Sequence, residues 1–208
     1  MKKRLMALVF PALLSACGAP EDTAPPAPSP FHAREVSARH GEGFEMTDRQ
    51  GRTRTLADWR GKVVLVFFGY THCPDACPSA LYRFSEVMER LGEEAAQVRV
   101  LFITLDPARD TPEILHNYAT AFNPAFIGLY VSPERTPEMA RAFHVFYRIA
   151  PGQTPDRYSV DHGVSVYAYD RSGRLRLEIP HTATADEVTD DVRRLIAEAE
   201  DREQKTED

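Results

Sequence analysis

The chain has 208 residues, a formal net charge of −6 and a hydrophobic content of 43%. This length suits one globular domain with terminal extensions. The acidic balance argues against nucleic-acid binding and against electrostatic attachment to anionic lipid, and three cysteines are too few for a disulfide-stabilised scaffold.

The first sixteen residues have the pattern of an export signal. Three basic residues at 2–4 precede the apolar run 5–14, which is too short to span a bilayer. The run ends in Leu-Ser-Ala before Cys17, which resembles the lipobox of bacterial lipoproteins. This resemblance implies cleavage before Cys17, lipidation of Cys17, and an exported protein tethered to the periplasmic side of a membrane by acyl chains alone. An ordinary signal peptide with a chance cysteine is the alternative.

Composition divides the remaining chain into three parts. Residues 17–42 begin with a Pro-rich stretch and are predicted to be a lipidated tether. Residues 43–198 are predicted to form one folded domain, with a monomer as the default state. Residues 199–208 are highly charged and are predicted to be a disordered tail.

The domain is predicted to begin with a hairpin, in which residues 44–47 and 53–56 flank the turn sequence Asp48–Gly51. Two nearly continuous apolar runs follow at 63–68 and 98–105, as is typical of strands buried on both faces. Between these runs, apolar residues recur at helical spacing up to a helix-ending glycine at position 92. The pattern predicts a β-α-β unit with parallel strands.

Capping residues and periodicity predict the rest of the domain. The expected elements are a helix at 110–122, a short strand at 126–130, a helix beginning at 136, a hairpin of strands 164–168 and 175–179, and a last helix from 184. This order is typical of a thioredoxin-like domain. The predicted fold class is therefore α/β, with three layers, a mixed central sheet flanked by helices, and an N-terminal β-hairpin.

Cys73 and Cys77 are the leading candidates for chemistry, because they follow the first buried strand directly. Two thiolates at this spacing either exchange electrons as a disulfide or bind a soft metal ion. Positions four apart share a helix face, and the positive end of a helix is expected to lower the pKa of both thiols. A disulfide here would close too small a loop to stabilise the fold much, which favours a functional role.

A metal site would need another ligand, and His162 is the best placed of seven histidines. It lies just before a predicted strand, in the loop that faces the cysteine loop in thioredoxin-like domains. His72 adjoins Cys73 and is expected to point away from the sulfurs. The other histidines fall in the tether, on helices or after the second hairpin: His32, His40, His116, His144 and His181.

Three sequence blocks carry a family resemblance: 68–78 with the sequence FGYTHCPDACP, 105–113 with LDPARDTPE, and 160–163 with VDHG. In this order they resemble the Sco/SenC family of copper proteins. The resemblance implies a thioredoxin-like fold and copper, as Cu(I), Cu(II) or both, bound by Cys73, Cys77 and His162. It also implies delivery of copper to the copper A subunit of cytochrome c oxidase, reduction of that centre's cysteines, or both. Further partners would be another periplasmic copper chaperone or a thiol reductant.

Several alternatives remain open at this level. The metallochaperone reading makes the protein a carrier and not an enzyme, whereas a thiol-disulfide oxidoreductase or a redox and copper sensor would use the same cysteines. We expect a Cys73–Cys77 disulfide to form readily in metal-free protein. A peroxiredoxin-type peroxidase is disfavoured because Tyr70 stands where such enzymes carry threonine. A structural zinc site lacks a fourth ligand.

Acidic residues near the motifs have competing interpretations. Asp75, between the cysteines, would orient the loop or accept a proton, or would simply stabilise a turn. Asp106 ends a buried strand and is a candidate to hold the metal ligands in position without touching the metal. Asp110 is interpreted as a helix N-cap and Arg109 as an ion-pair partner.

Overall fold

The structure is a computed structural model that describes residues 29–152, 154 and 157–207. The predicted signal peptide, the lipidation site Cys17 and the start of the tether lie outside the described residues. No helix in the described part of the chain is long and apolar enough to cross a membrane.

A six-stranded mixed sheet forms the centre of the domain, in the order β1-β10-β9-β4-β5-β6. Its central strand β4 pairs parallel with β5 and antiparallel with β9, and every residue of β4 is buried. The parallel pairing follows from the helical crossover between the two strands. The bounds are β1 Arg34–Ala38, β4 Val63–Gly69, β5 Val98–Thr104, β6 Ile127–Leu129, β9 Val166–Tyr169 and β10 Leu175–Ile179.

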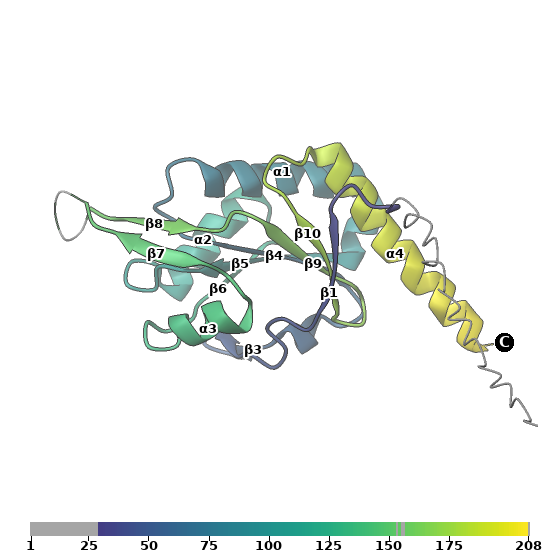
Figure 1. The fold of residues 1–208 in the computed structure, drawn as a ribbon, viewed down its shortest axis with the longest axis horizontal. Helices are drawn as coiled ribbons and strands as arrows, with labels where there is room; N and C mark the ends of the chain where they lie inside the picture. The colour runs from purple at the N-terminus through teal and green to yellow at the C-terminus, as the bar shows by residue number, and fades with distance from the viewer. Residues whose placement is uncertain (1–28, 153, 155–156, 208) are drawn as a thin grey trace, which may run out of the picture.

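Helices cover both faces of this sheet (Figure 1). α1 and α4 pack against each other, and α2 contacts α1, whereas α3 and the β2–β3 hairpin lie on the other side of the central strands. Short 3-10 turns occur at Leu56–Trp59 and Gly92–Gln97. The predicted three-layer thioredoxin-like α/β fold is confirmed. The helix bounds are α1 Ala76–Leu91, α2 Pro112–Phe122, α3 Thr136–Ala142 and α4 Ala185–Glu207.

The folded domain begins earlier than the sequence predicted. β1, assigned in advance to the tether, pairs antiparallel with β10. Phe31 is only 7% exposed, and the buried Asp191 of α4 accepts the backbone N–H groups of His32 and Ala33 at 2.8 Å each. This edge strand has mostly exposed side chains, so its sequence lacks an apolar pattern. The strand is placed by its pairing with β10, and the segment just before it by hydrogen bonds to Asp191, about 160 positions away along the chain.

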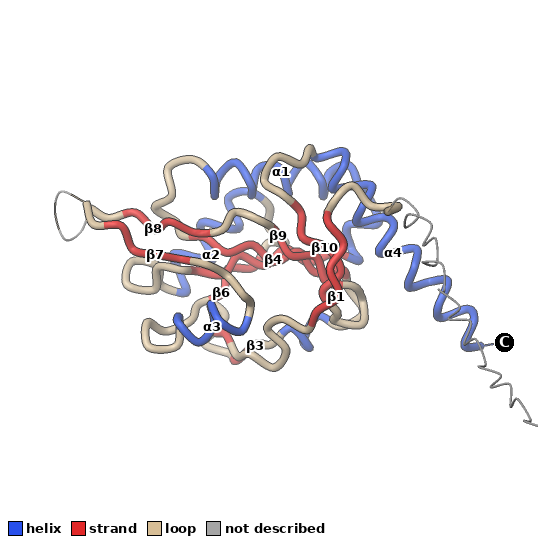
Figure 2. Tube along the Cα trace, viewed as in Figure 1, coloured by secondary structure: helices blue, strands red, loops and turns tan. Residues whose placement is uncertain are grey.

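Two small hairpins stand outside the main sheet. The predicted N-terminal hairpin is present as β2 Met46–Thr47 and β3 Thr53–Arg54, shorter than expected. A further hairpin, formed by β7 Tyr147–Ala150 and β8 Ser159–His162, occupies the region where a loop was expected before the strand at 164. It projects from the end of the molecule opposite α4 (Figures 1 and 2).

Two helix ends also differ from the prediction. Thr111 and not Asp110 is the N-cap of α2, since the Thr111 hydroxyl accepts the Ile114 backbone N–H at 3.2 Å. α4 begins as predicted, with a reciprocal Thr184–Glu187 capping box. It continues to Glu207, past residue 198, where a disordered tail was expected. The sequence from 199 to 207 contains no glycine or proline to end the helix.

Candidate metal centre

The two cysteines lie at the junction of β4 and α1. Cys73 is half-buried in the connecting loop, and Cys77 is 0% exposed in the first turn of α1. Both are free thiols, and the Cys77 backbone N–H donates to Cys73 Sγ at 3.4 Å. The helix start therefore directs a backbone donor at one sulfur while it buries the other.

The two thiols have opposite acidities. A hydrogen bond from the Cys77 thiol, opposed by burial and supported by backbone N–H donors of Asp75 and Cys77, lowers the pKa of Cys73 to about 5. The same shared proton, together with burial, raises the pKa of Cys77. The expectation that the helix start lowers both pKa values is thus wrong for Cys77. Two adjacent sulfurs share one proton, and the buried sulfur keeps it.

Gly69, the last residue of β4, makes room for the buried sulfur. A Cβ atom at this position would lie 2.6 Å from Cys77 Sγ and 2.8 Å from the Phe102 ring. Sequence reasoning did not single out this glycine. A glycine that ends an otherwise bulky buried strand is the signal that could have identified it, because such a position often marks a close approach.

His162 ends β8 and brings an imidazole to the same place. Its Nε2 lies 3.8 Å from Cys77 Sγ, although 85 positions separate the two residues. Its Nδ1 lies 2.7 Å from the carbonyl oxygen of Gly163. Because a carbonyl only accepts hydrogen bonds, Nδ1 is the donor in this contact, and Nε2 is the ring nitrogen that faces the sulfur. Metal-bound histidines are commonly oriented in this way.

The structure therefore brings the three predicted ligands together. One donor atom from each of Cys73, Cys77 and His162 lies within 4.8 Å of the other two. Two soft sulfurs and one imidazole nitrogen form a donor set that suits copper or zinc. Two groups of described residues could hold a metal ion, and this one is the group that offers cysteine sulfur atoms.

The neighbouring acidic residues hold the cysteine loop. Asp110 is buried and accepts the Thr71 backbone N–H at 3.1 Å and the Thr104 hydroxyl at 2.7 Å. Burial raises its pKa, opposed by these hydrogen bonds. His72 is exposed and approaches Asp106 and Asp110 in a group separate from the sulfurs. The N-cap role predicted for Asp110 is thus replaced by a bridge between the β5 end and the loop.

Asp75 has the contacts of a turn residue. Its carboxylate accepts a hydrogen bond from the Ser79 hydroxyl at 3.3 Å, and its side chain is exposed. Its backbone N–H, and not its carboxylate, contributes to the lowered pKa of Cys73. The ion pair predicted for Arg109 is present, with Asp106 at 2.5 Å.

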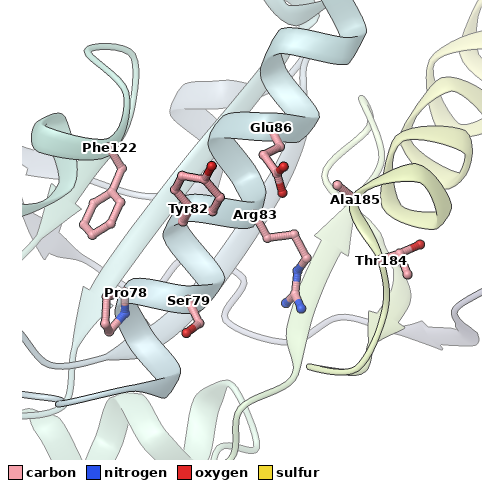
Figure 3. A pocket seen from close by; sticks show the side chains of 8 residues that line it. All are labelled: Pro78, Ser79, Tyr82, Arg83, Glu86, Phe122, Thr184 and Ala185. Atoms are coloured by element: carbon pink, nitrogen blue, oxygen red, sulfur yellow. The ribbon is translucent and has the colours of Figure 1, made fainter.

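A separate open groove runs along the outer face of α1 (Figure 3). Its volume is about 610 Å³, and Tyr82 and Phe122 line one part of it. Arg83 points toward the loop before α4, where it donates to the His181 carbonyl oxygen. None of the three candidate ligands lines this groove, so it is distinct from the candidate metal centre.

Comparisons with known proteins identify relatives of this chain. A family model described as SCO1/SenC matches residues 32–197. The bovine "Protein SCO2 homolog, mitochondrial" is 36% identical over 166 residues, covering 79% of this chain and 62% of that protein. The chain thus spans less than two thirds of the length of this mitochondrial relative.

Two solved structures show the same fold at similar identity. The copper-bound structure of ScoI from Bradyrhizobium japonicum has a TM-score of 0.69 and 36% identity, and the match covers 76% of this chain and 99% of that chain. The solution structure of apo Sco1 from Thermus thermophilus has a TM-score of 0.72 and 36% identity, and the match covers 79% of this chain and 96% of that chain.

Proposed function

Since the chain belongs to the SCO1/SenC family, we propose that it is a metallochaperone that binds one copper ion through Cys73, Cys77 and His162. The observation that carries the proposal is the convergence of two sulfurs and one imidazole nitrogen within 4.8 Å. Support for copper as the metal comes from the copper-bound ScoI structure, which is 36% identical to this chain.

The chemistry of the site suits a carrier. Thiolates and imidazole are soft or borderline ligands, and copper has the highest affinity in the divalent series. Three protein ligands leave a coordination position at which a partner thiolate can attach before the first ligands release. The lowered pKa of Cys73 keeps that sulfur ionised at neutral pH, so it is ready to bind metal.

The proposed acceptor is the copper A centre of cytochrome c oxidase, as the family resemblance implies. The proposed setting is the periplasmic side of a membrane, with Cys17 lipidated and the N-terminal segment as a tether. The SCO1/SenC match over 32–197 covers the domain that would carry the metal and leaves the preceding segment for attachment.

A second function is favoured by the paired thiols. The Cys73 thiolate would attack a partner disulfide to form a mixed disulfide, and Cys77 would then displace the partner thiol. The partner disulfide gains two electrons and two protons, one proton from the Cys77 thiol and one from water, while Cys73 and Cys77 become a disulfide. An ionised, accessible attacking sulfur beside a buried thiol is the arrangement this exchange needs. Oxidation would remove both thiolate ligands, so the two functions would alternate.

A copper titration of the soluble domain tests the proposal. Wild type is expected to bind one Cu(I) per chain, whereas Cys73→Ser and Cys77→Ser lose tight binding. His162→Ala should bind copper much more weakly but should still reduce a model disulfide. The matched control is His181→Ala, since His181 is exposed and only its backbone carbonyl makes a described hydrogen bond. Unchanged copper affinity in His162→Ala would refute the proposed ligand set.

A further inference from the structure

The third candidate ligand lies on a hairpin outside the main sheet. Among the described strands, β7 and β8 pair only with each other, and His162 is the last residue of β8. An isolated two-stranded hairpin is marginally stable in water. The distance between His162 and the two sulfurs therefore depends on the contacts that attach this hairpin to the domain.

One cluster makes that attachment at the start of β8. The Tyr158 hydroxyl donates to Asp106 Oδ1 at 2.5 Å, and Arg109 Nε donates to Asp106 Oδ2 at 2.5 Å. Arg109 Nη1 also donates to the Tyr158 carbonyl at 3.0 Å, and its guanidinium lies 3.6 Å from the centre of the Tyr158 ring. Both the side chain and the backbone of Tyr158 are thus held by residues of the segment after β5.

A second contact continues along the same strand. The Tyr70 ring lies edge-on to the His162 ring, with the ring centres 6.0 Å apart. Tyr158, Val160 and His162 alternate along the chain, so their side chains share one face of the strand. Val160 is buried and the other two are half-buried, which shows that this face points toward the domain.

Within this cluster, Asp106 belongs to the main domain and not to the hairpin. It lies close in the fold to the start of the cysteine loop. Gly69 at the end of β4 pairs with Thr104 at the end of β5, and Leu105 donates to the Gly69 carbonyl at 2.7 Å. The cysteine loop and Asp106 therefore start from adjacent ends of two buried parallel strands. Any residue held by Asp106 is positioned relative to the sulfurs.

We propose that Asp106, Arg109 and Tyr158, here called the hairpin latch, position His162 as the third ligand of the metal centre. The inference rests on the proposed function of that centre. The three are positioning residues, because they act on the metal through the hairpin and not by touching it. Opening the latch would release His162 while Cys73 and Cys77 stay in place. The latch would thereby set how tightly the protein retains copper.

The test compares latch variants in the soluble domain. Arg109→Gln and Tyr158→Ala should weaken Cu(I) binding about 10-fold, measured in competition with a chromophoric chelator. Losses of this size are typical when a residue that orients a metal ligand is removed. Tyr158→Phe should lose less Cu(I) affinity than Tyr158→Ala, because it keeps the aromatic ring that lies against the Arg109 guanidinium. In a His162→Ala background the same changes should cause no further loss, since the ligand they position is absent.

A metal-free measurement separates the latch from the copper proposal. The ring NMR signals of His162 report its position, because the Tyr70 and Phe67 rings lie 6.0 and 6.4 Å away. Arg109→Gln should shift or broaden these signals. The control is Arg148→Gln, because Arg148 pairs with Asp161 inside the hairpin, and no described hydrogen bond or ion pair links its side chain to the rest of the domain.

The outcomes are distinguishable. The latch is refuted if His162 signals and copper affinity stay unchanged in Arg109→Gln, or if the affinity loss is equally large in the His162→Ala background. If wild type binds no copper, the proposed function fails. The His162 signals of the metal-free variants then still decide whether the latch holds the histidine in place.

Discussion

The two halves of the candidate metal centre are held in different ways. The sulfurs sit between β4 and α1, where Cys77 and every residue of β4 are buried. The imidazole sits on the β7–β8 hairpin, where Phe146 is 65% exposed and Ile149 is 57% exposed. Core packing therefore fixes the sulfurs, whereas a few polar and aromatic contacts fix His162. Under the proposed function, a firmly held pair of ligands combined with one more loosely attached ligand would suit a copper ion that is first bound and then released.

The largest expected contrast comes from removing an apolar side chain in each half. Phe67→Ala empties a buried position in β4 between Phe84 and Phe102, so the free energy of unfolding should fall by about 3–5 kcal/mol. Ile149→Ala on the exposed hairpin should change it by less than about 0.5 kcal/mol. Denaturant unfolding of both variants measures this. Equal losses would contradict the division into a rigid and an adjustable half.

A second contrast uses one glycine from each half. Gly69→Ala forces a Cβ against Cys77 Sγ and Phe102. The free energy of unfolding should therefore fall by about 1–3 kcal/mol, and copper binding should weaken. Gly163→Ala is the control beside His162, because nothing lies within 4 Å of its added Cβ. Thermal melts and copper titrations compare the two. A Gly69→Ala protein with wild-type stability and affinity would show that the sulfur site is looser than its contacts indicate.

The two sulfurs should differ in reactivity in metal-free protein. With a pKa of about 5, Cys73 is ionised at pH 7, so its thiolate fraction should exceed that of an ordinary cysteine by about 30-fold. Alkylation with iodoacetamide should therefore occur at Cys73, slow as pH falls through about 5, and spare Cys77. Mass spectrometry of the alkylated peptides gives the site and the rate.

The Cys77→Ala variant sharpens this comparison. It removes the thiol that donates to Cys73, so the pKa of Cys73 should rise and its alkylation should require higher pH. An unchanged pH profile would mean that backbone donors and not the neighbouring sulfur keep Cys73 ionised.

The smallest effect is expected for an ion pair within the hairpin. Arg148 and Asp161 are 2.6 Å apart and largely exposed, so Arg148→Ala should alter stability by no more than about 1 kcal/mol and leave copper affinity unchanged. Denaturant unfolding and copper competition check both statements. A marked loss of copper affinity would show that the hairpin's own rigidity, and not only its attachment, positions His162.

Much of the rigid half could be predicted from the chain. The apolar run of β4, the helical spacing in α1 and the glycine at its end are local patterns, and each forms the element it predicts. The cysteine spacing likewise predicts two sulfurs at a helix start. His162 was identified differently, through the family resemblance and the loop geometry of thioredoxin-like domains.

The sequence by itself determined the elements whose patterns repeat over a few residues, because burial periodicity and capping act between near neighbours. Only the tertiary structure decided the opposite acidities of Cys73 and Cys77, the place of β1 and the existence of the β7–β8 hairpin. These features depend on burial or on contacts between distant segments, such as Tyr158 with Asp106, 52 positions away. No local pattern specifies such contacts, because they form only when the sheet brings the strand ends together.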